Sequence, residues 1–581
     1  MREGSALKIE WVRDFNASVR RVWPFVSDTN RFNKIAGLPE VERVGEMDPR
    51  QLTQTLRLRV GGFTLEWQEE FFQWEKEKNF SIRRHYRGGP MLRLEVRARF
   101  EVTSVTHSRL RYDILATPRF AFLKPLIWFQ LQFIEKPKFF RAFARIENAV
   151  LHAPSRVPKI QTERPRLSDD QAERARTILD RCALTPELRE RFLHLVNYGD
   201  DFDLLHLRPY VLAQEWNEKR TEMLQAFIKM AAEGLMEFRW TFVCPLCQGA
   251  KGEALNLDEV NGNAHCDACQ IDFTTDFERN MELTFRPSEE VRLIRVADYC
   301  LGGPEKTAHI VAQKILEPGT TESFEFVPEA GPYRLRDFRG AILEELTFPG
   351  NGRLVAFHWE NPSTERRVRI LEKDLRSQEK TLAVEAINEP LFRRFFSNQL
   401  LRQGLSFKVG TRTFVFTDIK GSTALYETMG DGEAFGQVLA LFNLLEKEVK
   451  LAGGHVVKTM GDGAMILFDT SDAALRAMRL AQREVERHTG GQLRLRIGIH
   501  RGPALATTFS ERIDYFGSTV NFVSRIEGLS SGRDIIISER VWEDELQGRK
   551  ALEETFDFEL FQAEVKGFEG LRNFYRMTPK P

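Results

Sequence analysis

The sequence lacks an excess of charge of either sign, and its first residues lack the pattern of a signal peptide. Lys and Arg total 84 among the 581 residues, and Asp and Glu also total 84, so the formal net charge is zero. This balance gives no electrostatic reason to expect nucleic acid or an anionic membrane as a partner. Residues 1–14 mix charged and apolar types, without the basic-then-apolar order of a signal peptide. We therefore expect a cytoplasmic protein that binds no nucleic acid.

Long apolar runs and cysteines are also scarce. The most membrane-like stretch, Phe120 to Ile134, is interrupted by charged, proline and amide residues and is too short to cross a bilayer. We therefore expect no transmembrane segment. Six cysteines are too few for a disulfide framework in a chain of this length, and four of them form two CxxC pairs. That arrangement favours a metal site over disulfide bridges.

Residues 1–152 alternate apolar and polar side chains as β-strands do. A short helical segment, Arg20 to Gly37, interrupts the strands, and a long aromatic helix is expected from Leu123 to Leu151. This order, with the local run VWPFVSDT at Val22 to Thr29, resembles START-like or polyketide-cyclase-like helix-grip domains. The resemblance implies an apolar small-molecule or lipid ligand. The alternative is a closed aromatic core with no ligand, since buried aromatic side chains normally fill cores.

Residues 166–280 are expected to form a helical, winged-helix-like adaptor. Ser168 and Thr185 are placed to cap two helices, and a third helix is expected from about Arg208 to Gly234, before the strand Leu235 to Val243. Three helices and a strand are the order of a winged helix. The mixed charge of the third helix favours a packing or protein-binding role over DNA binding.

Two cysteine pairs lie at the end of this segment. Cys244 and Cys247 are followed, after eighteen residues, by Cys266 and Cys269. Two CxxC pairs at this spacing predict a zinc ribbon in which four thiolates surround one Zn²⁺. Four protein ligands leave no open position, so the zinc would be structural. His265 adjoins Cys266 and is an alternative ligand, although four cysteines already suffice.

Residues 281–385 again alternate like strands, with Gly and Pro between them, which predicts a small β-sandwich. Residues 386–410 are expected to form a linker helix. The last expected domain spans residues 411–581, and the whole chain is therefore predicted to be a multidomain α+β protein.

The last domain contains side chains suited to phosphate chemistry. The apolar strand Phe414 to Phe416 leads to Asp418, which is well placed to hold a hard cation. Gly421 permits close approach of a phosphate, and either Ser422 or Thr423 is placed to cap the next helix, where backbone amides favour anions. A second carboxylate, Asp462, lies in a tight turn after the strand His455 to Thr459, and this hairpin can place it beside Asp418.

Two neighbouring carboxylates suit Mg²⁺ or Mn²⁺. Two such ions are the recurring arrangement for in-line phosphoryl transfer. Asn521 and Arg525 are four residues apart on an expected helix and share one face. An amide and a forked guanidinium suit a ribose and a charged phosphorane.

Three motifs in this region occur in order: FxDIxGS from Phe416 to Ser422, KxxGD from Lys458 to Asp462, and DxxGxxVNxxxR from Asp514 to Arg525. With them, residues 412–577 resemble the class III nucleotidyl cyclases. The resemblance implies a ferredoxin-like core and a homodimer whose sites are shared between subunits, with metals on one subunit and base-reading and transition-state residues on the other.

The resemblance also implies a role for each matching residue. Asp418, Asp462 and the Ile419 backbone would hold two Mg²⁺ or Mn²⁺ ions. Lys458 and Asp514 would read the adenine edge, Asn521 would orient the ribose, Arg525 would stabilise the pentavalent phosphorus, and Lys566 would contact the triphosphate along with Gly421 and Ser422. Guanylate cyclases of the family typically carry Glu and Cys at the two base-reading positions.

The sequence therefore predicts an adenylate cyclase that converts ATP to cyclic AMP and pyrophosphate under the control of its N-terminal domains. Three alternatives remain open. One is a guanylate cyclase, which Lys458 and Asp514 disfavour. The second is a signalling scaffold with a cyclase fold and no turnover. The third is an apolar-ligand carrier in which residues 1–150 hold the main function.

Overall fold

The computed structural model describes most of the chain. The described residues are 6–48, 51–60, 62–152, 165–260, 262–266, 269–276, 279–373, 380–396, 399, 406–421, 426–427, 430–491, 493–509, 512–544 and 549–580. They form two compact units. The first comprises residues 1–253, 263–275 and 282–381, and the second comprises residues 254–262, 276–281 and 382–581. Among the described residues, no helix combines the length and apolarity needed to cross a membrane.

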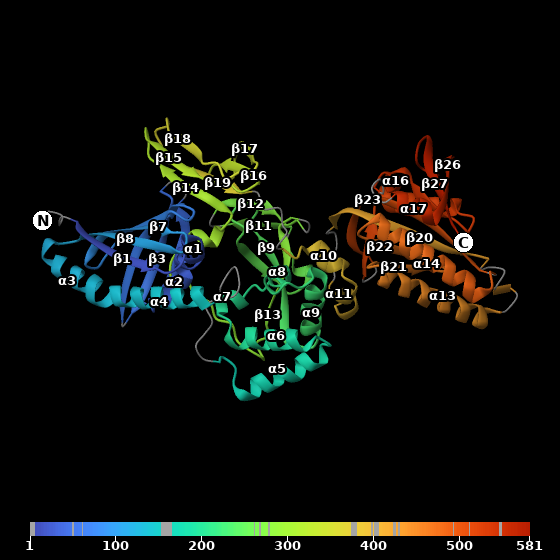
Figure 1. Cartoon of the computed structure of the whole chain (residues 1–581), viewed down its shortest axis with the longest axis horizontal. Helices are drawn as coiled ribbons and strands as arrows, with labels where there is room; N and C mark the ends of the chain where they lie inside the picture. Colours follow the sequence, from blue (N-terminus) through green and yellow to red (C-terminus); the bar gives the residue numbers. More distant parts are fainter. Residues whose placement is uncertain are drawn as a thin grey trace. The chain divides into compact units, whose positions relative to one another are not determined.

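The first unit is built on a twelve-stranded sheet (Figure 1). Its strands are β1 (Leu7–Phe15), β2 (Glu42–Asp48), β3 (Thr53–Val60), β4 (Phe63–Glu70), β5 (Gln73–Glu75), β6 (Asn79–Tyr86), β7 (Met91–Ser104), β8 (His107–Pro118), β14 (Ile310–Leu316), β16 (Gly331–Arg336), β17 (Ile342–Phe348) and β19 (Arg367–Lys373). They run in the order β1-β8-β7-β6-β5-β14-β19-β16-β17, with β2, β3 and β4 paired beside β6. The outermost β1 pairs with β8 in antiparallel register from Leu7 opposite Ala116 to Phe15 opposite Ser108.

Helices pack on the N-terminal strands of this sheet. They are α1 (Val19–Ser27), α2 (Thr29–Ile35), η1 (Ala121–Leu123), α3 (Lys124–Phe129), the π-helical turn η2 (Gln130–Glu135) and α4 (Lys136–His152). Trp23, Phe80 and Phe143 are almost completely buried between helices and sheet. The expected short helical segment and long aromatic helix are therefore present. The helix-grip assignment and its ligand stay predictions.

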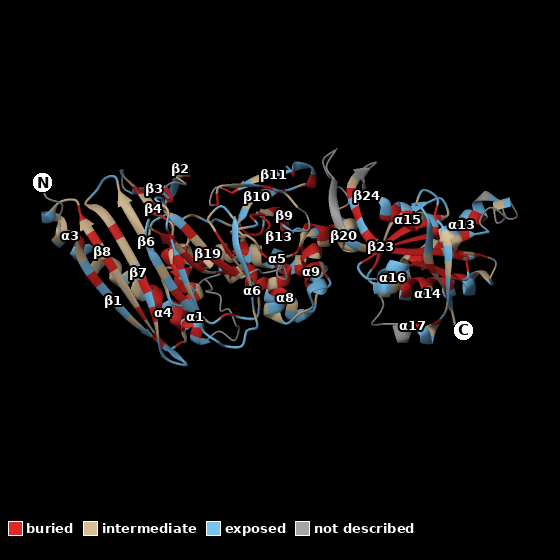
Figure 2. Cartoon of the chain, turned by 90° about the horizontal axis from the view of Figure 1, so that it is seen from above, coloured by how far each residue is buried: buried red, intermediate tan, exposed pale blue. Residues whose placement is uncertain are grey.

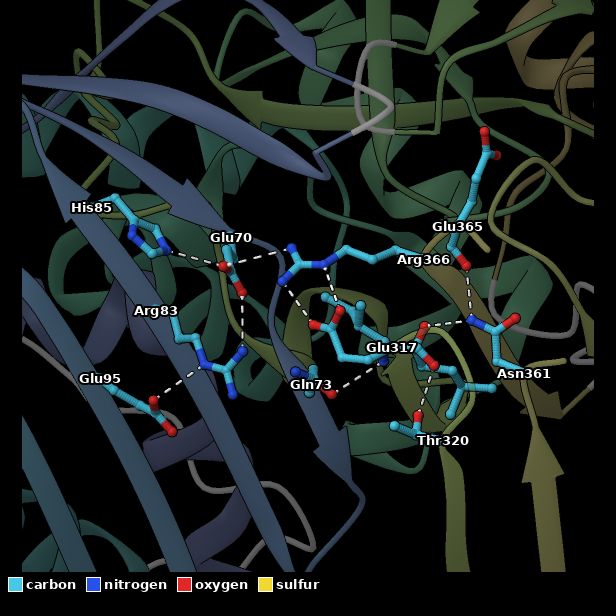
Figure 3. A network of polar contacts seen from close by, with 12 residues as sticks. Glu70, Gln73, Arg83, His85, Glu95, Glu317, Thr320, Asn361, Glu365 and Arg366 are labelled. Carbon is cyan, nitrogen blue, oxygen red and sulfur yellow. Dashed lines mark hydrogen bonds and ion pairs between the residues drawn. The ribbon is translucent and has the colours of Figure 1, made fainter. Parts of the chain in front are cut away.

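The strands after residue 281 do not form a separate body, because β14 pairs with β5 (Ala312 opposite Glu75). Figure 3 shows a polar network across this junction. The buried Glu70 carboxylate accepts from His85 Nε2 at 3.0 Å and lies 3.8 Å from Arg366, whose guanidinium is also 2.7 Å from Glu317. The expected small β-sandwich thus has one layer that continues the N-terminal sheet.

The second layer of that sandwich is the two-stranded ribbon of β15 (Thr321–Phe326) and β18 (Val355–Glu360). Phe324 of β15 and Trp359 of β18 are buried together with Tyr333 of β16 and Leu371 of β19. The two layers therefore enclose an apolar core of their own.

Five helices and a small sheet form the segment expected to be winged-helix-like. The helices are α5 (Asp169–Arg181), α6 (Pro186–Tyr198), α7 (Asp201–Leu204), α8 (Pro209–Trp216) and α9 (Arg220–Ala232), and the sheet order is β10 (Ala250–Ala254), β9 (Met236–Val243) and β13 (Met281–Pro287). Ser168 and Thr185 cap α5 and α6 as expected. The single helix expected from Arg208 to Gly234 is divided, because Asn217 adopts the left-handed conformation that ends α8.

The second unit contains an eight-stranded sheet in the order β21-β22-β20-β23-β25-β27-β26, with β24 on β23. Its strands are β20 (Ser406–Lys420), β21 (His455–Met460), β22 (Gly463–Phe468), β23 (Arg494–Phe509), β24 (Arg512–Phe516), β25 (Ile535–Ser538), β26 (Phe556–Glu564) and β27 (Leu571–Pro579). Its main helices are α10 (Ala383–Asn388), α11 (Pro390–Phe395), α13 (Asp431–Leu451), α14 (Ser471–Thr489), α15 (Ser518–Ile526), α16 (Glu539–Asp544) and α17 (Arg549–Thr555).

The chain order β20-α13-β21-β22-α14-β23, with spatial order β21-β22-β20-β23, is that of a ferredoxin-like core. Figure 2 shows the buried residues of this unit concentrated along the sheet under its helices. Val415, Ile466 and Ile499, on three neighbouring strands, are completely buried. This core holds the central strands in place, and the polar residues lie at the ends of those strands.

Candidate active site and metal centre

The predicted metal ligands Asp418 and Asp462 lie together. Asp418 is near the end of β20, and Asp462 is in the turn between β21 and β22. The turn approaches β20 closely, because a side chain at Gly463 would come within 2.7 Å of the Thr417 carbonyl oxygen. Burial raises the pKa of Asp418, and the nearby Asp462 carboxylate raises it further. The ends of two adjacent strands therefore place like charges side by side.

Two further charged residues face this pair, and sequence reasoning missed both. Arg496 of β23 lies opposite Asp418 in the sheet, with Nη1 3.5 Å from Asp418 Oδ2. Glu527, which follows α15, has a pKa raised to about 7, first by burial and then by the Asp418 charge. Its Oε1 is buried and has no hydrogen-bond partner among the residues that the structure describes. The Arg496 position could have been found from strand register, whereas nothing local in the sequence indicates Glu527.

These carboxylates fit a divalent cation. Burial and the Asp462 charge raise the pKa of Asp418 even though Arg496 lowers it, and a bound cation would offset both. An oxygen-only donor set suits Mg²⁺ or Mn²⁺. The Ile419 backbone, also predicted to bind metal, forms a hydrogen bond to the Asp418 carboxylate. Gly421 directly follows β20 and is exposed, whereas Ser422 lies outside the described residues.

The predicted base-reading residues form a second group. Lys458 Nζ of β21 is 2.5 Å from Asp514 Oδ2 of β24, and only 8% of the Asp514 surface is exposed. The other carboxylate oxygen, Asp514 Oδ1, accepts the Tyr515 backbone N–H at 2.8 Å. The side chains are thus held in one geometry, with a third of the Lys458 side chain open to solvent.

The predicted transition-state residues lie on α15. Asn521 and Arg525 are both exposed. The Arg525 guanidinium lies 5.9 Å from the Phe568 ring centroid and so close to Gly567 that any side chain there would collide with it. Lys566, predicted to contact the triphosphate, is exposed in this same loop after β26. The loop thus places a second positive charge near Arg525.

The four cysteines of the predicted zinc ribbon converge. Cys244 follows β9, and Cys266 ends β11 (Asn263–Cys266), which pairs with β12 (Ile271–Thr274). Their sulfur atoms, with those of Cys247 and Cys269, all lie within 4.8 Å of one another. The Cys247 and Cys266 sulfurs are 3.8 Å apart. A tetrahedral site with Zn–S bonds of about 2.3 Å requires a sulfur separation of about 3.8 Å.

Backbone amides complete this cluster. The Leu246 N–H donates to Cys244 Sγ at 3.4 Å, and the Cys269 N–H donates to Cys266 Sγ at 3.3 Å. These bonds orient the sulfurs of both CxxC turns inward. His265, the alternative ligand, instead binds Asp272 with its Nδ1 at 2.8 Å. The predicted cysteine cluster is therefore confirmed, and its geometry fits zinc.

Comparisons with known proteins identify a cyclase catalytic domain in the second unit. Residues 407–575 match the family model of the adenylate and guanylate cyclase catalytic domain, and residues 170–300 match a family of unknown function, DUF5939. An adenylate cyclase of Anabaena cylindrica is 36% identical over 179 residues, covering 26% of this chain and 36% of that protein. An adenylate cyclase of Mycosarcoma maydis is 35% identical over 167 residues, covering 24% of this chain and 6% of that protein.

The chain therefore spans well under two thirds of the length of these relatives. Among solved structures, the adenylyl cyclase CyaB from P. aeruginosa superposes with a TM-score of 0.27 at 23% identity, covering 30% of this chain and 97% of that one. The predicted class III cyclase catalytic domain in the C-terminal part of the chain is confirmed by the family match.

Proposed function

We propose that residues 411–581 form an adenylate cyclase, which converts ATP to 3′,5′-cyclic AMP and pyrophosphate. The observation that carries this proposal is the contact between the half-buried Lys458 and the buried Asp514. An ammonium group donates to a ring nitrogen of adenine, and a carboxylate accepts from its 6-amino group. The keto oxygen of guanine at the same position would face the carboxylate and repel it. The pair therefore favours ATP, as the names of the relatives do.

The phosphate chemistry would use the other two groups. Asp418, Asp462 and the Ile419 backbone would hold two Mg²⁺ or Mn²⁺ ions, which polarise the attacking 3′-oxygen and neutralise the triphosphate when bound. Asn521 would position the ribose so that its 3′-hydroxyl faces the α-phosphorus. Arg525 would stabilise the charge that develops there, and Lys566 with Gly421 and Ser422 would bind the remaining phosphates.

We further propose that the working form is a homodimer with two composite sites. Asn521 and Arg525 are exposed on α15, and the acidic pair lies at the ends of β20 and the β21–β22 turn. Exposed transition-state residues need opposing metal ligands, and a two-fold axis would supply them from the second copy. ATP as substrate is in keeping with the expected cytoplasmic location.

Regulation by the preceding segments would act through the linker helices. Arg393 of α11 donates to the Tyr515 hydroxyl at 2.5 Å, and Tyr515 is 1% exposed and directly follows the base-reading Asp514. A shift of α11 would therefore be transmitted to the strand that carries Asp514. We propose this contact as the route from the N-terminal part of the chain to the site.

The proposal is tested by incubating the full chain with Mn²⁺ and either ATP or GTP and separating the products by chromatography. We expect cyclic AMP and pyrophosphate from ATP, with little cyclic GMP. The matched control is Asp418→Asn, which keeps the shape of the side chain and should abolish turnover. Cyclic GMP as the main product would identify a guanylate cyclase, and no product from either nucleotide would favour a scaffold.

A further inference from the structure

One helical surface of the first unit is apolar and exposed, and nothing in the proposed catalytic function uses it. The exposed residues lie on η1, α3 and η2, and we call them the aromatic face: Phe122, Leu126, Trp128, Phe129, Phe133 and Ile134. Phe122 is 74% exposed and Phe133 is 59% exposed. Contiguous apolar surface of this kind marks an interaction site more often than an ordinary exterior.

The aromatic face is continuous and well anchored. The Phe129 and Phe133 rings stack at 5.1 Å between centroids, and the Trp128 ring meets Phe133 edge-on at 5.7 Å. On the opposite side of α3, Ile127 is 2% exposed and packs with Trp11 in the core beneath. The helix is therefore held to the sheet by one face while its aromatic face points outward. In Figure 2, α3 lies at the end of the sheet close to the N-terminus.

The segment that carries this face is rich in positive charge. Residues 119–145 contain six basic side chains and a single acidic one, Glu135, which gives a formal charge of +5 in a chain whose net charge is zero. Glu135 itself pairs with Lys138 at 3.4 Å. Arg119 donates to the Tyr86 and Gly89 backbone carbonyls, which carry no net charge, so these hydrogen bonds do not neutralise the guanidinium.

The neighbouring elements add to this charge. Arg141 donates to the uncharged backbone carbonyl of Pro137, and Lys136 lies over the Phe140 ring at 5.5 Å. The turn between β6 and β7, which Arg119 holds, carries the exposed Arg87. Lys8 lies at the start of β1, the strand beside β8. The acidic residues nearby are paired, because Glu10 of β1 pairs with Arg111 and Glu95 of β7 pairs with Arg83.

We propose that the aromatic face binds the surface of a membrane that contains anionic lipids. Phe, Leu and Trp on one side of a helix with Lys and Arg around them are the composition of helices that lie in the bilayer interface. Trp in particular favours the headgroup level. Each basic residue near an anionic surface strengthens the attraction.

The positive charge of residues 119–145 also favours an anionic membrane over a second copy of the chain as the partner of the aromatic face. Two aromatic faces docked on each other would bring two segments of charge +5 together, and this like-charge contact opposes association. An anionic lipid surface compensates the same charge.

The test is co-sedimentation of the full chain with vesicles of phosphatidylcholine alone and with vesicles that contain about 30% phosphatidylglycerol, at about 0.1 M salt. We expect binding to the anionic vesicles that weakens as salt is raised, and little binding to the neutral ones. Equal binding to both, or no binding to either, overturns the proposal.

Two variants and a matched control locate the surface. Trp128→Ser with Phe129→Ser should weaken binding to anionic vesicles about tenfold or more. Lys136→Gln with Arg141→Gln should weaken it about 25-fold, at about fivefold for each charge. The control, Val102→Ser with Val105→Ser, removes two exposed apolar residues from the β7–β8 hairpin and should bind like the unmodified chain.

Folding and self-association are monitored in the same preparations. If thermal melting shows that the aromatic variant is destabilised, the charge variant decides, because its side chains are not in the core. Unchanged vesicle binding by the charge variant overturns the proposal. A loss of dimer mass in sedimentation velocity of the aromatic variant, with unchanged vesicle binding, assigns the face to a second copy and also overturns it.

Discussion

Complementation between two inactive variants tests the proposed composite site. Asp418→Ala removes a metal ligand, and Asn521→Ala removes the ribose contact from α15, so each variant alone should have nearly no activity. If metals come from one subunit and Asn521 from the other, a mixed dimer holds one site with both lesions and one site with neither. The structure supports this division, because Asp418 interacts with Asp462, whereas Asn521 lies exposed on a separate helix.

The magnitude follows from counting sites. Random mixing at equal expression makes about half of the dimers mixed, each with one intact site of two, so about a quarter of the unmodified activity should return. The assay is cyclic AMP formation per total protein after co-expression, with mixed dimers verified by two affinity tags. A site contained within one chain predicts activity no higher than the average of the two variants.

A matched control uses two lesions on the same side of the site. Co-expression of Asp418→Ala with Asp462→Ala leaves every site of a mixed dimer without one metal ligand, so no activity should return. Recovery in this control would contradict the proposed pairing of the two aspartates, even if the first mixture behaves as expected.

Two further predictions concern stability. Zinc removal by a chelator, or Cys244→Ser, should lower the melting temperature by at least about 5 °C. The control Cys182→Ser, which changes a buried cysteine outside the cluster, should have a smaller effect. Elemental analysis that finds no zinc in fresh protein would refute the site. Burial lowers the pKa of His500 from its ordinary 6.5 to about 4. The unfolded chain therefore binds more protons between these values, stability is lost as the pH falls, and this group should remove about 2 kcal/mol from the free energy of unfolding between pH 8 and pH 5. His500→Asn should remove that part of the slope in urea unfolding followed at both pH values, and an unchanged slope would show the assignment to be wrong.

The sequence predicted those parts of the site that depend on short-range patterns. The apolar runs on either side of Asp462, with glycines in the turn, indicated a hairpin, and the hairpin is present as β21 and β22. The cysteine spacing likewise indicated a cluster, and the four sulfurs converge. Both features rest on residues close together in the chain or on a known ligand spacing.

Long-range pairings could not be predicted in this way. The pairing of β5 with β14 joins strands more than two hundred residues apart, and neither strand differs in pattern from one that stays within its own domain. Glu527 follows a helix and reads as a surface charge, yet the fold brings it to Asp418. The division of the helix at Asn217 depends on that one residue adopting a left-handed conformation, and asparagine also occurs inside helices, so its presence alone did not indicate the break.

The most direct test of the central claim is the ratio of kcat/KM for ATP to that for GTP, before and after exchange of the base-reading pair. Asp514 is buried, so a mismatched base leaves polar groups unpaired, and two such groups should cost about 2–4 kcal/mol, or about 30- to 900-fold in the ratio. We expect Lys458→Glu with Asp514→Cys to lose the ATP preference by this factor and gain activity toward GTP, while Lys450→Glu, the same charge change on the exposed face of α13, leaves the ratio unchanged. A double variant that keeps the original preference for ATP would contradict the assignment of Lys458 and Asp514 as the residues that read the base.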